Sequence, residues 1–489
     1  MATRNARPVP PVSGKRQPNA RNGTAMTHDA GNERYRRLPT GSHGLDPELV
    51  KRDQRERLQQ ALIELIAEKG YPAVRIVDLA KLAHVSQPTF YSLFADKEDL
   101  FLSAYDAVAM KAAAAVMAAF HVERPLEQRL VAALRAWAEL AAAEPEAISL
   151  LVLGAFGAGA SALERRRLLL AALERRLHAG RASNGRAWEE REGSPTANPG
   201  DLIVKAILGG IREVTAARLR EGRASELPAI ADELTAWAGC YPRELPAGLD
   251  APPLVRDDCA SGAASPPSER ARAAEGRLPS GRSDLPRQFI VKSQRERIVD
   301  ATAAIVAEKG LAALTVPEIA RRANVSHQTF YGIYASKHDA FLGAQKVGMH
   351  QALAVAVDAY QAHQPEWPRA AGAGLCALID YLASEPAHAH LSLVDTFAAC
   401  PEAIEIRDAT LQAFAAYFAP AYELARGHVD VPAIAAEAIA GGIWQILHHY
   451  IENDRIAELP GAAAQLTYFA LTPFLGATDA AAYALPASS

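Results

Sequence analysis

The stretch that decides the fold is Leu79–Phe101, LAKLAHVSQPTFYSLFADKEDLF, together with its second version at Ile319–Phe341, IARRANVSHQTFYGIYASKHDAF. In each version a short amphipathic segment is followed by a polar turn, a serine suited to capping a helix, and a second short segment. Two short helices joined by a tight turn form a helix-turn-helix, whose second helix enters the major groove of DNA. The pattern therefore predicts a DNA-binding element that occurs twice in the chain.

The two versions belong to a longer internal repeat. Gln54–Leu102 aligns without gaps to Gln294–Leu342, and 22 of the 49 aligned residues are identical. A weaker match continues downstream, where Gly209-Gly210-Ile211 corresponds to Gly441-Gly442-Ile443. Self-similarity of this kind indicates one structural unit written twice, with about 190 residues per copy.

Helical periodicity dominates both copies, and no alternating strand pattern is present, so the fold class is predicted to be all-α. In the first copy the pattern predicts helices over 52–69, Ile76–Ala83 and Gln87–Leu93, and a long helix that begins at Lys97. In the second copy it predicts helices over Lys292–Lys309, Val316–Ala323 and His327–Ile333, and a long helix that begins at Lys337. Ser86 and Ser326 are the expected N-caps of the second helix in each motif. Thr315 with Glu318 predicts a capping box, for which the first copy has Arg75 instead.

Both stretches resemble the DNA-binding motif of the TetR family of regulators. The shared features are a Gly-terminated first helix, an IA or LA pair, VS, the TFY triplet, an aromatic residue three positions on, and a lysine. By this resemblance the motifs span Arg75–Phe94 and Thr315–Tyr334. The implied organisation is a disordered basic tail, a helix-turn-helix domain, a helical effector and dimerisation domain, a linker, and a second pair of domains. Their expected ranges are 1–49, 50–110, 111–240, 241–287, 288–350 and 351–480.

Residue types at the start of each second helix point to base contacts. The candidates are Gln87, Pro88 and Thr89 in the first copy and His327, Gln328 and Thr329 in the second. Because these residues differ between the copies, we expect an asymmetric operator with unlike half-sites, and a glutamine side chain can pair bidentately with adenine. Phosphate contacts are expected from a hydroxyl in each TFY triplet and a lysine at the start of each long helix, namely Tyr91, Tyr331, Lys97 and Lys337. The residues at helix starts complete the candidate DNA-binding set: Arg75, Ser86, Thr315 and Ser326.

The larger part of each copy is expected to bind a small-molecule effector and to pair the copies. By the resemblance, the last two helices of each copy form a four-helix interface, within one chain as a pseudo-dimer or between chains as a homodimer. Effector pockets are mostly apolar with a few polar groups, and the second copy is richer in aromatic residues. The candidate ligand-binding residues are Phe397, Tyr417, Trp444 and His448, for which ordinary core packing is the alternative interpretation. The identity of the effector is left open.

Composition limits the other function classes. The net charge of −4 provides no global positive field, so contact with double-stranded DNA must come from a local patch. Four cysteines without a metal-ligand spacing are typical of reduced thiols in a cytoplasmic protein. We expect no membrane span, because no apolar run was found to reach the roughly 18 residues that one needs. No nucleophile–base pattern, phosphate loop or metal spacing favours an enzyme or a cofactor. An interaction protein that has lost DNA binding is the other alternative, against which the intact tyrosine and lysine positions argue.

Overall fold

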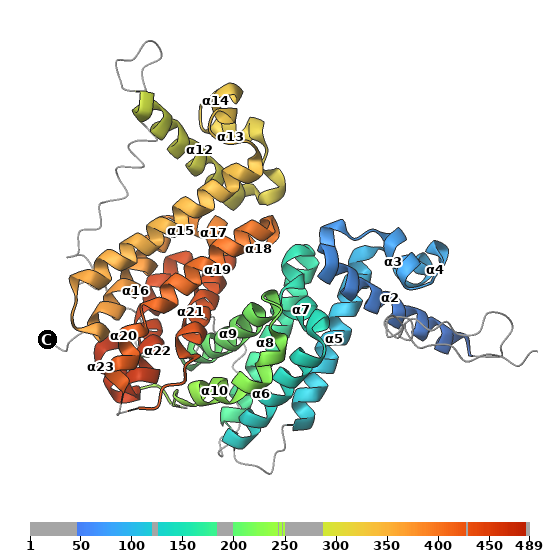
Figure 1. Ribbon diagram of the computed structural model, residues 1–489, viewed down its shortest axis with the longest axis horizontal. Helices are drawn as coiled ribbons and strands as arrows, with labels where there is room; N and C mark the ends of the chain where they lie inside the picture. The colour runs from blue at the N-terminus through green and yellow to red at the C-terminus, as the bar shows by residue number, and fades with distance from the viewer. Residues whose placement is uncertain are drawn as a thin grey trace, which may run out of the picture.

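The computed structural model describes residues 46–119, 126–182, 199–242, 244–246, 248–249, 287–426 and 429–485. Within these ranges every regular element is a helix and no strand occurs, which confirms the all-α prediction. The two copies of the repeat are called unit 1, up to residue 249, and unit 2, from residue 287. Figure 1 shows two helical bodies that lie against each other, each with a small three-helix domain projecting from it. The expected tail, 1–49, lies outside the described residues except for its last four, and α2 begins at Pro47.

The two predicted DNA-binding domains contain the helices expected from sequence, with small differences at their ends. Unit 1 has α2 (Pro47–Lys69), α3 (Ile76–Leu82) and α4 (Gln87–Leu93), followed by α5 (Lys97–Ala119). Unit 2 has α12 (Arg287–Lys309), α13 (Val316–Arg322) and α14 (His327–Tyr331), followed by α15 (Lys337–Ala362). Helix α14 is two residues shorter than predicted, because Gly332 follows it and forms a turn. Gly70 and Gly310 end the first helix of each unit at a φ of +75°, a backbone conformation that residues other than glycine rarely adopt.

The remaining helices form the body of each unit. Unit 1 contributes α6 (Leu126–Ala143), α7 (Pro145–Val152), α8 (Ala160–Ala182), α9 (Pro199–Arg220) and α10 (Leu227–Gly239). Unit 2 contributes α16 (Trp367–Ser384), α17 (Pro386–Leu393), α18 (Thr396–Ala399), α19 (Pro401–Ala416), α20 (Ala419–Ala425), α21 (Ala435–Glu452), α22 (Ala463–Leu475) and α23 (Ala477–Ala484). Short 3-10 turns η1 (Tyr71–Ala73), η2 (Gly154–Gly157), η3 (Ala224–Glu226), η5 (Leu311–Ala313) and η6 (Ile456–Ala462) connect several of them.

Helices α9 and α21 pack closely where the two bodies meet. A Cβ atom on Gly209 would lie 3.5 Å from the Cα of Gly442, and one on Gly441 would lie 3.5 Å from the Cα of Gly210. The first glycine of each pair therefore faces the second glycine of the other pair. Such reciprocal contacts are the signature of a two-fold, isologous interface. The absence of side chains here is required, because a Cβ on Gly210 would lie 2.4 Å from the carbonyl oxygen of Ala438.

The core is continuous across this contact. Trp237 of α10 and Phe469 of α22 hold equivalent positions beside the glycine pairs, and their ring centroids are 6.0 Å apart. Tyr241 stacks on Phe469 at 5.0 Å and donates a hydrogen bond from its hydroxyl to the carbonyl of Phe469. Leu249 is also buried, and its carbonyl accepts a hydrogen bond from Gln465. The first residues of the expected linker therefore belong to the packed core, whereas 250–286 lie outside the described residues.

Ion pairs also join the two bodies. Arg218 of α9 pairs with Glu437 of α21 at 2.9 Å, and both side chains are half-buried. Glu213 of α9 pairs with the fully buried Arg407 of α19 at 2.5 Å. Burial alone would raise the pKa of Glu213, but the charges and hydrogen bonds of Arg407 and Arg220 together outweigh it and lower that pKa to about 2. Glu213 is consequently ionised, and its pairing with Arg407 fixes how unit 1 sits on unit 2.

Among the residues that the structure describes, one helix is long and apolar enough to cross a membrane by length and composition, although the sequence analysis expected no membrane span. It is α5, whose most apolar window has a mean hydropathy of 1.4. Its first turn carries Lys97, Glu98 and Asp99, and its buried side chains include Phe101 and Tyr105. These side chains pack in the core of unit 1, so the apolar composition of α5 is that of a helix connecting two domains.

Candidate nucleic-acid interface and effector cavity

The second helix of the motif in unit 1, α4, is capped and exposed as predicted. The Ser86 hydroxyl accepts a hydrogen bond from the backbone N–H of Thr89 at 3.1 Å, and Pro88 occupies the first turn, where no N–H is needed. Gln87 and Pro88 are exposed, whereas Thr89 is half-buried with its hydroxyl bonded to Ser86 at 2.8 Å. Gln87 and Pro88 are thus free to contact bases. Thr89 would first have to break the hydrogen bond between its hydroxyl and Ser86.

The other side of the motif anchors α4 in the protein. Phe90 is fully buried and Phe94 nearly so, which leaves the helix only one face to present. Tyr91, between them in sequence, is 57% exposed, and Tyr331 in the second motif is 59% exposed. An aromatic residue this exposed contributes little to folding, so its hydroxyl is available to a phosphate oxygen.

Unit 2 repeats this geometry on the shorter helix α14. Ser326 accepts from the N–H of Thr329 at 3.0 Å, and His327 and Gln328 are exposed beside it. The turns that precede the two helices also match, because His84 and Asn324 both have φ near +50°. Figure 1 shows α4 and α14 at the outer ends of their domains, away from the contact between the units.

Arg75 and Thr315 occupy the same position but hold their helices differently. The Thr315 hydroxyl accepts a hydrogen bond from the N–H of Glu318 at 3.4 Å, so the predicted N-cap is present with a long hydrogen bond. The Glu318 side chain does not complete a capping box, since it pairs with Lys309 and Arg321. Arg75 makes no cap and pairs with Asp78 at 3.0 Å; this hydrogen bond, followed by that of Lys69, lowers the pKa of Asp78. Arg75 remains exposed, so it can exchange Asp78 for a phosphate.

The two lysines that open the long helices face inward. Lys97 Nζ donates to the carbonyls of Tyr71 and Val74 at 2.9 and 3.0 Å and lies 4.2 Å from the centre of the Tyr71 ring. Lys337 Nζ donates to the carbonyl of Leu314 at 3.0 Å. Both ammonium groups therefore link the start of the long helix, α5 or α15, to the segment that follows the first helix, α2 or α12. Their predicted contact with phosphate stays a prediction, and it requires these hydrogen bonds to loosen.

The first four residues of the aligned repeat, QRER at 54–57 and 294–297, supply basic residues that sequence reasoning did not assign. Arg57 Nη1 donates to the carbonyl of Ala83 at 2.6 Å, and Arg297 donates to that of Ala323 at 2.9 Å, so each closes the end of the first motif helix. Arg55 is exposed and lies over the Phe94 ring, with the guanidinium 5.9 Å from the ring centre. Arg295 lies over Tyr334 in the same way, at 6.0 Å. The two exposed arginines flank the recognition helices and are additional candidates for phosphate contacts.

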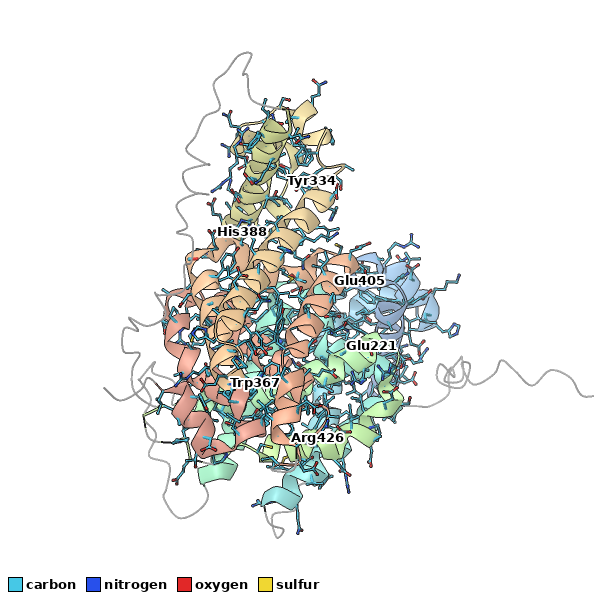
Figure 2. All side chains as sticks on the ribbon, turned by 60° about the vertical axis from the view of Figure 1, so that its left-hand side comes forward. Glu221, Tyr334, Trp367, His388, Glu405 and Arg426 are labelled. Carbon is cyan, nitrogen blue, oxygen red and sulfur yellow. The ribbon has the colours of Figure 1, made fainter. Side chains whose placement is uncertain are left out.

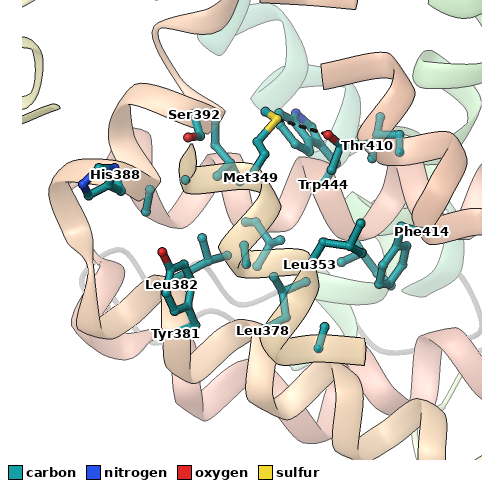
Figure 3. A pocket seen from close by; sticks show the side chains of 18 of the residues that line it. Met349, Leu353, Leu378, Tyr381, Leu382, His388, Ser392, Thr410, Phe414 and Trp444 are labelled. Carbon is teal, nitrogen blue, oxygen red and sulfur yellow. Dashed lines mark hydrogen bonds between the residues drawn. The ribbon is translucent and has the colours of Figure 1, made fainter. Parts of the chain in front are cut away.

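A cavity of about 670 Å³ lies in the body of unit 2 between α15, α16, α17, α19 and α21. Its lining is apolar over most of its surface, as Figure 3 shows for Met349, Leu353, Leu378 and Phe414. A smaller cavity of about 310 Å³ lies where the units meet and includes Arg212 and Arg407. The 670 Å³ includes space that is open to solvent, so the enclosed part of this cavity is much smaller.

The four predicted ligand residues do not all line one cavity. Trp444 lines both the 670 Å³ cavity and the smaller one, while Tyr417 lines a third cavity beyond Phe414. His448 lies in the smaller polar cavity, with its ring 6.1 Å from that of Phe156 of unit 1. The side chain of Phe397 lies outside the described part of the chain. Sequence reasoning missed His388 and Ser392, which line the large cavity, because their i, i+4 spacing gave no sign of what they face.

Comparison with known proteins matches the two motifs. The model of the bacterial regulatory proteins of the tetR family matches residues 59–104 and again residues 298–343. A crystal structure of the transcriptional regulator FadR from Bacillus subtilis in complex with stearoyl-CoA is 18% identical to this chain. The likeness covers 37% of this chain and 96% of FadR, with a TM-score of 0.32. No curated protein matches the chain.

Proposed function

This chain belongs to the TetR family as a DNA-binding transcriptional regulator with two TetR-type units in tandem, and from that premise we propose that it is a ligand-responsive repressor of an asymmetric operator. The observation that carries the proposal is the pair of exposed helix starts. Gln87 and Pro88 stand where His327 and Gln328 stand in unit 2, on backbones with the same caps and turns. Two recognition helices with the same backbone geometry but different side chains are suited to bind half-sites of different sequence.

The two units act as an intramolecular pseudo-dimer in this proposal. The reciprocal glycine contacts between α9 and α21 support it, as do the ion pairs Arg218–Glu437 and Glu213–Arg407. A dimer of identical subunits places identical recognition helices on two half-sites and so prefers a palindrome. Fusion of two diverged units removes that constraint and lets each arm evolve its own half-site.

The response to a ligand resides in the 670 Å³ cavity of unit 2 in this proposal. Helix α15 lines the cavity and begins at Lys337, directly after the helix-turn-helix of unit 2. A ligand that wedges α15 against α16 and α17 would change the direction in which α14 projects. It would weaken operator binding only by as much as its affinity differs between the two arrangements.

Selection of binding sites from a random pool of duplexes, using the full chain, tests the two unlike heads. We expect a bipartite, non-palindromic site. Gln87→Ala should change the preferred bases in one half-site only, and His327→Ala in the other, because each side chain serves its own arm. His350→Ala, at an exposed position of α15 outside the motif, is the control. A palindromic site, or unchanged preferences in both variants, would contradict the proposal.

Salt titration on the selected duplex separates phosphate contacts from base contacts. We expect the affinity to fall steeply with salt, and Tyr91→Phe to weaken binding to all duplexes about equally. Binding that is absent or independent of salt would instead favour the interaction-protein alternative. Placing the selected site across a promoter then tests repression, since a repressor lowers transcription when it occupies that site.

A further inference from the structure

The unit 2 cavity has one polar end, built by two residues of α17. His388 is 5% exposed and Ser392 is 3% exposed, and they lie one helical turn apart on the same face. His388 Nδ1 and Ser392 Oγ are both buried without a hydrogen-bond partner, although both residues line the cavity. Buried polar atoms are nearly always paired in folded proteins, so two unpaired atoms side by side indicate a missing partner.

Gly348 of α15 packs directly against this polar end, where a side chain would crowd both polar atoms. A Cβ at this position would lie 2.9 Å from Ser392 Oγ and 3.5 Å from His388 Nδ1. Figure 3 shows His388 and Ser392 together at one edge of the cavity, with Leu382 and Met349 beside them. Among the other polar side chains that line the cavity, Tyr381 donates to Gln351 and Thr410 donates to the carbonyl of Ile406. The indole N–H of Trp444 is buried without a hydrogen-bond partner, as the two atoms of the polar end are.

The hydrogen bond on the far side of the His388 ring defines the chemistry of the partner. His388 Nε2 lies 3.1 Å from a carboxylate oxygen of Asp300, which can only accept, so in the neutral ring the proton sits on Nε2. Nδ1 of the neutral ring then presents a lone pair, while Ser392 can donate its hydroxyl proton. A ligand hydroxyl satisfies both, by donating to Nδ1 and accepting from Ser392, whereas a carboxylate would repel the Nδ1 lone pair.

Resting on the ligand response proposed above, we propose that this cavity binds an apolar molecule with one hydroxyl group, an alcohol or a phenol, held between His388 and Ser392. Asp300 belongs to α12, the first helix of the second DNA-binding domain, so the ligand hydroxyl is one imidazole ring away from that domain. Figure 2 places His388 just beneath the domain that carries Tyr334. Occupancy of the cavity therefore acts first on the arm that holds α14.

Unit 1 has no counterpart of this polar end. Helices α7 and α17 correspond residue for residue, and Ala147 and Leu151 stand where unit 2 has His388 and Ser392. Val108, whose side chain is buried, replaces Gly348, and Gln60 replaces Asp300. The duplicated chain thus has one hydroxyl-binding sensor for two DNA-reading arms.

Calorimetric titration of the full chain with matched probes tests the site without DNA. The bicyclic probes are 2-naphthol, naphthalene and 2-naphthoate, and the linear probes are 1-decanol and decanoate. We expect each hydroxyl compound to bind at least tenfold more tightly than its carboxylate, and 2-naphthol more tightly than naphthalene.

Ser392→Ala should weaken the binding of 2-naphthol about tenfold and leave the binding of naphthalene unchanged, and Gly348→Val should weaken the binding of both. Ser384→Ala, on the neighbouring α16 with its hydroxyl bonded to Tyr381, is the control. Tighter binding of the carboxylates, or an unaltered 2-naphthol affinity in Ser392→Ala, overturns the proposal.

The link to DNA is measured separately with Asp300→Asn. We expect this variant to keep 2-naphthol binding within about threefold but to lose most of the change in operator affinity that 2-naphthol causes. Full response in Asp300→Asn overturns the proposed route. If 2-naphthol binds as described but operator affinity never changes, the hydroxyl site stands and the ligand-responsive function fails. If the chain binds no operator, the calorimetric arm still decides the site.

Discussion

At the scale of the residue, the structure assigns roles that the residue type leaves open. His448 was predicted to bind a ligand, but it is buried in a polar cluster between the units, near Arg166, Arg212 and Arg407. Burial, followed by these positive charges, holds the pKa of His448 well below its usual range, although Glu452 lies 3.4 Å from its Nδ1. The folded chain therefore keeps this ring neutral in mildly acidic solution.

Unfolding at mildly acidic pH tests this assignment. Below about pH 6.5 the unfolded chain takes up a proton at His448 that the folded chain refuses, so stability falls by about 1.4 kcal/mol per pH unit from this residue. His448→Phe should reduce that slope between pH 6.5 and 5, as measured by denaturant unfolding. His449, whose pKa burial lowers to about 4, contributes in the same direction, so some slope should remain. His350→Phe, at an exposed site, should leave the slope unchanged, and an equal slope in His448→Phe would refute the assignment.

At the scale of the element, the two helix-turn-helix motifs show one backbone stabilised in two ways. Helix α13 has a hydroxyl cap from Thr315, whereas α3 starts at Arg75 without a cap and relies on the exposed pair with Asp78. In both units the same kind of turn leads from the first helix into this helix. At its C-terminal end, a carbonyl accepts a hydrogen bond from a buried or half-buried arginine, Arg57 or Arg297. The capped and uncapped helices thus form a natural pair for comparison.

Substitution of the N-cap residue, Arg75 or Thr315, should change the stability of the DNA-binding domain that contains it. Arg75→Thr is expected to stabilise the first DNA-binding domain by about 0.5–1 kcal/mol, because a hydroxyl cap outweighs an exposed ion pair. Thr315→Ala should destabilise the second domain by a similar amount. Hydrogen exchange of the α3 and α13 amides measures each domain separately. Arg75→Ala is the matched control, since it removes the ion pair and adds no cap; a gain as large as that of Arg75→Thr would show that capping is irrelevant here.

At the scale of the whole molecule, the distance between the two arms is set where α9 meets α21. A Cβ on Gly210 would lie 2.4 Å from the Ala438 carbonyl oxygen and 2.6 Å from the Trp237 ring, neither of which can move freely. The same holds for Gly442, beside the Ala206 carbonyl and Phe469. The glycine pairs are therefore required by the contact between units and not by any turn.

Gly210→Ala should separate the two bodies. We expect a loss of about 1–3 kcal/mol of stability from overpacking and a weaker preference for the wild-type spacing of the half-sites. Thermal unfolding measures the first, and affinity for duplexes with one or two base pairs added between half-sites measures the second. Gly239→Ala, where a Cβ meets nothing within 4 Å, is the control. A normal stability and spacing preference in Gly210→Ala would mean that the contact does not position the arms.

The local features of the fold could be predicted from sequence because they depend on near neighbours. Ser86 and Ser326 cap the helices assigned to them, and Gly70 and Gly310 end the helices before the motifs. The exposure of Gln87 and His327 also followed, because a capped helix anchored by a buried Phe leaves its first turn outside. The direction of Lys97 did not follow, since the carbonyls that it binds belong to a loop 23 to 26 residues earlier.

The sequence by itself determined that the chain carries two helix-turn-helix motifs, where their helices begin, and that the residues at the exposed start of the second helix differ between them. These properties rest on hydrogen bonds and packing within a few residues, and the duplication repeats them. Only the tertiary structure decided that His388 and Ser392 share a cavity, that His448 lies between the units, and that the glycine pairs meet. Each of those contacts joins helices that are distant in sequence, and local periodicity carries no record of which helix lies opposite.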